Sequence, residues 1–544
     1  LGLKAFHLNL FKVGMIALLG AIGVSILVTD RTSQYLLHVA GRLNAATVKQ
    51  QRMMGWGVGV AFTGFLIYLR VRQYFELQTM YDMTVEANVA WHMVHGPWFF
   101  NSLDHDSFLG GHFSLVFFLI GAIYRWAEHP ITLLVIQSVA LGGGAVAVYY
   151  VALARKTTTS VALLAMALYM FNPYTHHISA HDFHLSPLAI PAILWMLYFI
   201  DSAQPWKAGA AALLSFTVEE SILLPLVGVG LYLIAFRPQW RIFGLGLALL
   251  SLTYFVVITK VLMPMFVPGR GLFFWDRYAN LGGSLNEAIG HLLSHPIWAA
   301  MEALIRRNQY VYLLYFLLPV VFLPVFSLPE AGLIVVPLTI MFLSQDPGMY
   351  KLGFHYSALA LPFLFYGVVC GLSKLPDYRF WTGVRQTHGK FLLSGIFFLL
   401  ALNTYRSPGY DLGQTDSQFA SSAFELSSLV PPDASVATAL RFGPLLANRH
   451  YICRISGVPG EVCAWQVEVL SGPNWSTPLW QPQYVLIGAE PGKTTSEKLK
   501  EQTQYAKWLT DSKGYEEIRS QDGIRLFRST IALSSGERIN EKKD

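Results

Sequence analysis

The chain has 544 residues, of which 53% are hydrophobic and 13% are charged, and its mean hydropathy is +0.43. A soluble domain usually carries about 25% charged residues, so this composition excludes an ordinary soluble enzyme. The formal net charge of +6 does not indicate nucleic-acid binding, because the basic residues lie in short connections between apolar runs and not in one stripe.

Apolar runs that could cross a hydrocarbon core, alone or in pairs, follow one another as far as Leu402. We expect about twelve crossings. The first run resembles a signal-peptide core, but it is long and lacks a clear cleavage site before Arg31, so it predicts a retained span. The runs are 12–28, 55–71, 131–154, 160–171, 185–200, 209–216, 222–236, 242–266, 310–326, 332–343, 356–372 and 391–402.

Basic residues between these runs predict the orientation, because cytoplasmic connections are enriched in Lys and Arg. The clusters are Arg31 with Arg42, Lys49 and Arg52; Arg155 with Lys156; Arg237 with Arg241; and Lys374 with Arg379, Arg385 and Lys390. The segments that then lie on the opposite, extracytoplasmic face are 72–112, 172–184, 267–308, 345–355 and the tail after Tyr405. The sequence thus predicts a multi-pass protein of the cell (inner) membrane.

The composition predicts three parts. Residues 1–54 form an extra span and a cytoplasmic connection, 55–404 form an all-α polytopic domain with a large external loop at 72–112, and 405–544 form a small extracytoplasmic α/β domain. In the last part, short alternating strands at 435–439, 450–455, 484–487 and 524–527 surround a helix at 496–513. Cys453 and Cys463 could form a disulfide there, or remain two thiols. This domain could also recruit protein partners.

Two apolar pieces look too short for simple spans. Phe113 to Trp126 is expected to lie along the interface or to re-enter the membrane. Gly209 to Phe216 is followed at once by Glu219 and Glu220, which predicts a broken helix pair with carboxylates facing a polar cavity. Pairing of these glutamates with an arginine is the structural alternative.

The external loop carries the first candidate site. Asp82 and Glu86 are spaced to share one helix face, and a carboxylate there suits a general base or, with histidines, a divalent-cation site. A solvated interface helix is the alternative. Asp104-His105-Asp106 and His112 follow, in a pattern that suits either a cation or a turn whose aspartates bond local backbone.

The second candidate lies at 176–184, where four histidines and Asp182 fall within nine residues. Imidazole and carboxylate are good ligands for zinc, manganese or iron, whereas a histidine-rich interface loop can also simply bond headgroups or backbone. We favour Asp182 and His184 over His176 and His177. A divalent ion, if present, is expected at Asp82, His181 and His184.

Further polar groups are predicted on the same face. Arg270 and Arg277 lie among aromatic residues and could clamp a phosphate, although interfacial anchoring by those aromatics is the alternative. Lys351, His355 and Tyr356 complete the set.

Several short motifs, taken in their order along the chain, resemble those of bacterial and archaeal multi-pass membrane proteins related to the GT-C glycosyltransferases. The matching pieces are Tyr81-Asp82, Gly110-Gly-His112-Phe-Ser, His181-Asp-Phe-His184-Leu-Ser-Pro187, Val218-Glu-Glu220 and His355-Tyr356. The resemblance implies a GT-C-like fold in which Asp82 occupies the position of the acidic catalytic residue. It also implies transfer of a sugar from a polyprenyl-phosphate carrier at the outer face to a lipid, glycan or protein acceptor.

We therefore expect Asp82 to be the base, with Asp182, His184, Glu219 and Glu220 as further catalytic groups. Substrate contacts are expected from Glu86, His112, His181, Arg270, Arg277, Lys351, His355 and Tyr356. Two alternatives stay open. One is an ion or solute permease that relays protons through Glu219 and Glu220, and the other is a non-catalytic membrane subunit of a larger complex.

Overall fold

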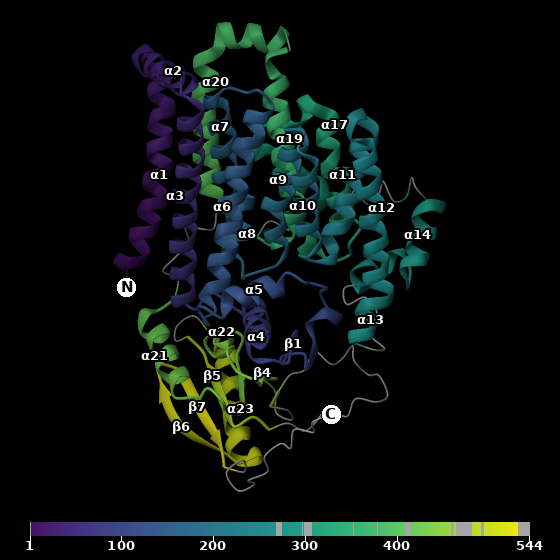
Figure 1. Ribbon diagram of the computed structural model, residues 1–544. Helices are drawn as coiled ribbons and strands as arrows, with labels where there is room; N and C mark the ends of the chain where they lie inside the picture. Colours follow the sequence, from purple (N-terminus) through teal and green to yellow (C-terminus); the bar gives the residue numbers. More distant parts are fainter. Residues whose placement is uncertain are drawn as a thin grey trace.

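The structure is a computed structural model. It describes residues 2–530 apart from 268–274, 296–297, 299–306, 352, 378, 408–414, 458–461, 464–480 and 491–493. Long helices pack side by side at one end of the molecule, a five-stranded sheet lies at the other end, and α4, α5 and β1 lie between them (Figure 1).

The helices before the sheet fall into three consecutive groups along the chain. The first group is α1 (Gly2–Val28), α2 (Asp30–Asn44), α3 (Val48–Phe75), α4 (Tyr81–His95), α5 (Phe117–Tyr124), α6 (Ile131–Ala154) and α7 (Thr159–Met170). The second is α8 (Pro173–Ala180), α9 (Ala189–Asp201), α10 (Pro205–Phe216), α11 (Leu223–Phe236), α12 (Arg241–Val257), α13 (Met263–Phe266) and α14 (Leu285–Ser294). The third is α16 (Arg307–Leu317), α17 (Leu328–Ala331), α18 (Val335–Phe342), α19 (Leu361–Lys374) and α20 (Arg379–Arg406).

Fewer of these helices than predicted can cross a membrane alone. Among the described residues, four helices are long and apolar enough, or five if the bent pair α1 and α2 is one span. Four shorter apolar helices, of 10–17 residues, lie at 159–170, 186–201, 220–236 and 361–374. The expected number of about twelve crossings therefore stays a prediction. α5 has eight residues and is about 12 Å long, so it is too short to cross, as its sequence indicated.

The connection that the sequence predicted after the first apolar run is largely helical. The chain bends by 109° after α1 and continues as α2. α3 then begins at Val48, seven residues before the apolar run at Gly55, because Thr47 caps it. The Thr47 side chain accepts from the backbone N–H of Gln50, whose side chain bonds back to Thr47. This reciprocal cap satisfies donors that would otherwise lack partners at the start of a helix.

The apolar run 310–326 is not one helix, contrary to the sequence prediction. α16 ends at Leu317, and two short 3-10 helices follow. Between them Val321 and Phe322 adopt positive φ angles of 51° and 54°, and prolines 319 and 324 each lack a backbone donor. The chain then runs through α17 to α18, and the segment Leu323–Phe342 as a whole is long enough to cross.

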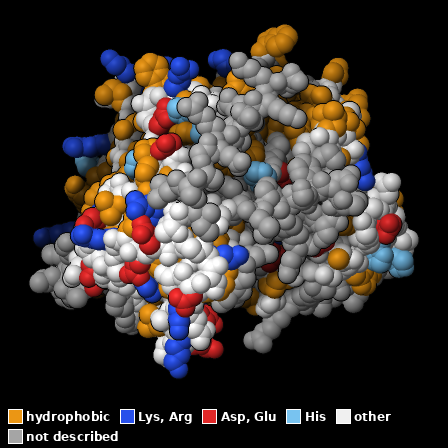
Figure 2. Space-filling model, turned by 90° about the horizontal axis from the view of Figure 1, so that it is seen from below, with side chains coloured by type: hydrophobic (Ala, Val, Ile, Leu, Met, Phe, Trp, Pro, Cys, Tyr) orange, Lys and Arg blue, Asp and Glu red, His pale blue; other side chains and the backbone are white. Residues whose placement is uncertain are grey.

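The C-terminal part contains the sheet, in the order β4-β3-β5-β7-β6. Its elements are β3 (Val436–Thr438), β4 (Ile452–Arg454), β5 (Tyr484–Gly488), β6 (Tyr515–Gln521), β7 (Ile524–Ser529), α21 (Ser417–Ser428), α22 (Gly443–Leu446) and α23 (Ser496–Lys513). β3, β4 and β5 are parallel, and β7 pairs antiparallel with β5 and β6. Cys453 and Cys463 form a disulfide, which decides between the two alternatives that the sequence left open. Viewed from this end, charged side chains of both signs mix over the domain (Figure 2).

A buried ion network closes the opposite end of the helical region. Asp201, at the end of α9, lies 2.6 Å from Arg155 and 2.8 Å from Arg237. Glu330 in α17 lies 3.0 Å from Lys374 and 3.5 Å from Arg155. These groups follow or end α6, α9, α11 and α19, so the network ties together the ends of helices that are distant in sequence.

Candidate functional site

A cavity of about 630 Å³ lies between α4 and the membrane helices. The described residues of its wall include six carboxylates. Arg277 is the one Lys or Arg side chain among them. The carboxylates are Asp82, Glu86, Asp104, Asp106, Glu219 and Glu220, and the wall also contains His112, His184, His355, Tyr81 and Tyr356. Apolar side chains complete it, among them Leu224, Phe255, Met263, Ile289, Leu292 and Ile340. The structure thus brings together most of the residues that the sequence singled out.

The first turn of α4 is held in place by Asp182. The Asp182 carboxylate accepts hydrogen bonds from the backbone N–H of Met80, at 3.0 and 3.1 Å, and of Met83, at 3.3 Å. A carboxylate is favourable at a helix N-terminus, where backbone donors lack partners. Burial, followed by the charge of Asp82, raises the pKa of Asp182 to about 6. Asp182 lies behind the cavity wall, and its contacts with Met80 and Met83 fix the position of Asp82, which lies between them in the same turn.

The opposite side of α4 is held by the C-terminal domain. The Asn88 side chain is fully buried and donates to the carbonyl oxygens of Ala447 and Arg449, both at 2.9 Å. Its own oxygen accepts from the backbone N–H and the hydroxyl of Ser102, at 3.1 and 2.9 Å. The Ser102 hydroxyl in turn lies 3.2 Å from the backbone of Ile452 in β4. Sequence reasoning missed Asn88, because a lone asparagine in a helix carries no signal of its partner.

We expect Asn88→Ala to lower the free energy of unfolding by about 2–4 kcal/mol, because four buried polar groups would each lose a hydrogen bond. Thermal or denaturant unfolding of the purified protein measures the change. Asn44→Ala is the control, because Asn44 makes a single exposed bond to Ser160, and it should cost less than about 1 kcal/mol. Equal losses for both variants would show that Asn88 does not clamp the helix.

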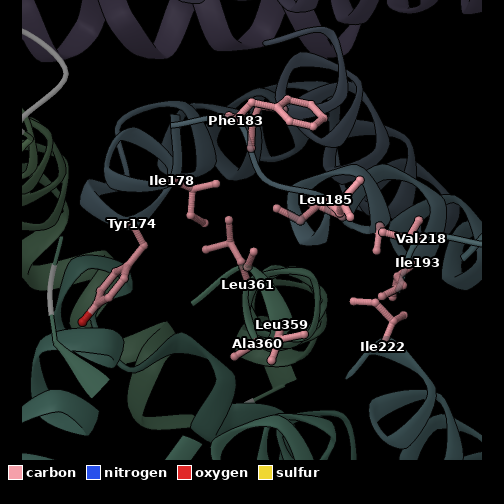
Figure 3. Close-up of a cluster of buried hydrophobic side chains, with 14 of the residues drawn as sticks. Tyr174, Ile178, Phe183, Leu185, Ile193, Val218, Ile222, Leu359, Ala360 and Leu361 are labelled. Carbon is pink, nitrogen blue, oxygen red and sulfur yellow. The ribbon is translucent and has the colours of Figure 1, made fainter. Parts of the chain in front are cut away.

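Alternating burial orients the histidine of the loop before α9. Phe183 and Leu185 are buried in the hydrophobic core, while His184 between them faces the cavity. Figure 3 shows Phe183 and Leu185 within this cluster, with Leu361 from the start of α19 nearby. Because successive side chains of an extended segment point to opposite sides, burying the two apolar neighbours turns His184 towards the cavity.

Buried apolar residues also flank the two glutamates between α10 and α11, where extended Glu219 is followed by a 3-10 helix that begins at Glu220. Val218 and Ile222 are buried and lie in the same cluster (Figure 3). Glu219 and Glu220 between them line the cavity. Glu219 is bonded by the Ser221 hydroxyl, and Glu220 accepts from the backbone N–H of Phe113 at 2.9 Å.

Asp82 is the most accessible of the carboxylates described so far, with 48% of its side chain exposed. Its Oδ2 lies 3.5 Å from Nε2 of His184. Partial burial raises the pKa of Asp82, but the bond and charge of His184, together with His181 and His112, outweigh this and hold the pKa below its usual value. Asp82 is therefore ionised at neutral pH and can accept a proton.

Three histidines gather beside Asp82. The rings of His184 and His355 are stacked with centroids 3.5 Å apart, and His181 lies 4.9 Å from His184 and 5.3 Å from His355. Burial lowers the pKa of His181 to about 4 and that of His355 well below its ordinary value. Burial also disfavours the charged form of His184, but the bond to Asp82 raises its pKa overall.

His112 forms an ion pair on the other side of the cavity. Its Nδ1 lies 3.2 Å from Glu220 Oε1. Burial lowers the pKa of His112, but the charge and bond of Glu220 raise it to about 9. His112 and Glu220 are therefore a charged pair at neutral pH, and Glu219 and Glu86 lie close enough to contribute to the same shift.

Residues 73–526 match the model of a protein family described as "Predicted membrane protein (DUF2079)". The chain belongs to the DUF2079 family. A comparison with curated proteins gives no match. The crystal structure of ArnT from Cupriavidus metallidurans bound to undecaprenyl phosphate resembles the fold with a TM-score of 0.51, at 13% identity over 89% of this chain and 99% of that one. The apo structure of the same protein gives 0.49 at 14% identity, with the same coverage. The likeness to the structure with undecaprenyl phosphate shows that this chain has a similar overall fold.

Among the described residues of this DUF2079 chain, Arg277 is the one arginine that lines the cavity. It lies 3.4 Å from Asp346 and over the ring of Tyr356, at 5.3 Å. Lys351 lies outside the cavity wall, 5.8 Å from the ring of Phe354. Arg270 lies outside the described residues. Of the predicted phosphate-binding cations, Arg277 is thus the one placed at the cavity.

The aspartates of the external loop have local partners. Asp104 accepts from Asn101 at 2.8 Å and from the Tyr81 hydroxyl at 3.4 Å. Asp106 belongs to β2 (Asp106–Ser107), which pairs with β1 (Phe100–Asn101). Both aspartates line the cavity. The cited partners of Asp104 are side chains and not the local backbone that the sequence suggested, and a cation at this loop stays a prediction.

Glu86 lines the cavity, and its Oε2 has no hydrogen-bond partner in the described part of the chain. Burial raises the pKa of Glu86 to about 8; the charges facing it are His184 and His112, which lower it, and Asp82 and Glu219, which raise it. Because this pKa exceeds the ordinary value, the folded state keeps a proton that the unfolded chain releases, and stability falls as pH rises from about 4.5 to 8. We expect Glu86→Gln to flatten this fall, raising the melting temperature little at pH 5 and most at pH 8 and above.

Melting curves of both proteins between pH 5 and 9 measure this effect. Glu497→Gln is the control, because Glu497 is exposed in the first turn of α23 and its loss should leave the pH profile unchanged. Parallel profiles for wild type and Glu86→Gln would contradict the raised pKa.

Proposed function

We propose that this protein transfers a sugar from a polyprenyl-phosphate donor to a lipid, glycan or protein acceptor at the extracytoplasmic face of the cell membrane. The observation that carries the proposal is the cavity, in which the ionised Asp82 lies beside histidines, five further carboxylates and an apolar wall. Pockets with perturbed titratable groups are the usual places of chemistry. The proposal places the C-terminal domain on the extracytoplasmic side, in agreement with the distribution of Lys and Arg.

The apolar wall suits a donor with a long hydrocarbon chain. Phe255 and Met263 belong to a segment, Pro238–Phe266, that is long and apolar enough to span the membrane, and Ile289 and Leu292 of α14 line the same cavity. A lipid chain in this part would bury apolar surface at about 25 cal/mol per Å². ArnT, whose fold is similar, binds undecaprenyl phosphate in its crystal structure, which supports a donor of this class.

The chemistry is a displacement at the anomeric carbon. The acceptor hydroxyl gives its proton to Asp82 as its oxygen bonds to that carbon, and the bond from the carbon to the phosphate oxygen breaks. The polyprenyl phosphate leaves with the electron pair, and Arg277 stabilises its charge. Glu219 and Glu220 hold the acceptor side, while protonated Glu86 offers a hydrogen bond through its unpartnered carboxyl.

The test is reconstitution of the full chain in lipid vesicles with polyprenyl-phosphate donors that carry labelled sugars. Transfer of label to lipid, glycan or protein with release of polyprenyl phosphate would support the proposal. Absence of turnover, with co-purification of partners in fixed stoichiometry, would instead favour a non-catalytic subunit. Uptake of labelled solute without transfer would favour a permease, which the ion network at the other end of the helices disfavours.

A further inference from the structure

Three imidazoles from two distant parts of the chain converge on one point. His181 and His184 follow α8, whereas His355 precedes α19. One ring nitrogen of each lies within 4.8 Å of the others. The sequence placed all three histidines on one face, but it predicted an ion at Asp82, His181 and His184 and gave His355 a substrate contact instead.

Two of these rings have buried nitrogens that bond to nothing within the described ranges, namely Nδ1 of His181 and Nδ1 of His355. Buried polar atoms are normally hydrogen-bonded, so such atoms indicate a partner that is not part of the chain. In His184, Nδ1 donates to the carbonyl oxygen of Asp182 at 2.8 Å. This bond fixes the ring orientation, and in the neutral imidazole it leaves the lone pair on Nε2, which is the tautomer of a metal-binding histidine.

The position of Asp82 supports an ion between these groups. Its Oδ2 lies 3.5 Å from Nε2 of His184, which is long for a hydrogen bond. Two atoms that bind one tetrahedral ion at about 2.0–2.1 Å lie about 3.3 Å apart. The observed separation is close to this value, so it leaves space for an ion on Nε2 of His184 whose open coordination position is directed towards Asp82.

The charge of the cavity favours a cation beside the proposed donor. Six carboxylates line the described wall, of which Glu86 is protonated, and they face Arg277 and the charged His112, so a phosphate entering this cavity meets an excess of negative charge. A divalent ion beside Asp82 would offset two of these charges at the place where the phosphate must bind.

We propose that His181, His184 and His355 bind a divalent ion of the zinc class, with its open coordination position towards Asp82 and the cavity. Nitrogen ligands favour zinc, whereas magnesium and calcium prefer oxygen. Three protein ligands with one open position are typical of catalytic zinc sites. The role of the ion in holding the donor phosphate rests on the proposed function, but its binding does not.

The experiment measures metal content and affinity in the full-length protein, purified without a histidine tag and stripped with a chelator. Zn²⁺ is added back, and Co²⁺ replaces it to report coordination through its absorption spectrum. We expect one Zn²⁺ per chain and a Co²⁺ spectrum of a low-coordinate nitrogen site. His355→Gln should weaken Zn²⁺ binding by at least 100-fold, because loss of even an outer partner of a ligand costs 10- to 100-fold.

His95→Gln is the matched control, because His95 pairs with Glu128 at the surface and its loss should leave Zn²⁺ binding unchanged. Wild-type protein that binds no Zn²⁺ overturns the site without reference to any variant, and so does equal binding by His355→Gln. A protein that binds Zn²⁺ at this site but transfers no sugar keeps the site and refutes the proposed function. A protein that transfers sugar but binds no Zn²⁺ refutes the site and keeps the proposed function.

Discussion

Asp82→Asn is expected to lower the rate of sugar transfer by about 10²- to 10⁴-fold, the usual contribution of a positioned general base. Asparagine has nearly the same shape but cannot accept the proton of the acceptor hydroxyl. The helix that carries residue 82 should remain in place, since Asp182 and Asn88 hold it through backbone contacts that do not involve the Asp82 side chain. The initial rate of label transfer in vesicles measures the effect.

The control for this variant is Asp511→Asn, which removes an exposed carboxylate at the end of α23 and should leave the rate unchanged. Donor affinity should also persist in Asp82→Asn, because the apolar wall and Arg277 are intact. Full transfer by a well-folded Asp82→Asn protein would remove Asp82 from the mechanism, and another carboxylate of the cavity would have to supply the base.

Much of the fold follows from local sequence. The helix predicted at 496–513 is α23, because its polar residues have high helix propensity and Thr495 and Gly514 cap its ends. The strands predicted in the C-terminal part are β3, β4, β5 and β7. β6 was missed because it is an exposed edge strand with charged residues, and its pattern lacks the apolar alternation of a half-buried strand.

The membrane region was less predictable in detail. Apolar runs indicate lipid exposure, but they do not show where prolines and left-handed residues such as Val321 break a helix. They also do not distinguish a loop from a helix such as α2, which is polar enough to interrupt an apolar run yet remains helical. The number of crossings therefore depends on tertiary packing, which a count of apolar residues does not contain.

Convergence of the site was predictable, but the roles within it were not. The distribution of Lys and Arg placed Asp82, His184 and His355 on one face, and the structure brings them to one cavity. In the sequence, Asp182 cannot be told from a catalytic acid, because it is an aspartate among the same polar residues. In the structure, its carboxylate bonds the backbone of α4. Only the three-dimensional contacts separate a carboxylate that caps a helix from one that faces a substrate.

Asp201→Asn is expected to lower the free energy of unfolding by about 3–5 kcal/mol, which is the usual cost of breaking a buried ion pair. The Asp201 side chain is 3% exposed, and it pairs with Arg155 and Arg237 and accepts from the Tyr366 hydroxyl at 3.3 Å. Without the charge of Asp201, the Arg155 and Arg237 guanidinium groups remain close together. Arg155 still pairs with Glu330, whereas Arg237 loses the carboxylate with which it pairs. Unfolding of the purified protein by heat or denaturant measures the loss.

The matched control is Glu425→Gln, which neutralises a surface carboxylate that is 48% exposed and 3.3 Å from Arg519. Exposed pairs contribute about 0–1 kcal/mol, so this variant should unfold close to wild type. The comparison separates burial from charge, because both substitutions remove one carboxylate that faces arginine. If Asp201→Asn were no less stable than Glu425→Gln, the network would not hold together the ends of α6, α9, α11 and α19.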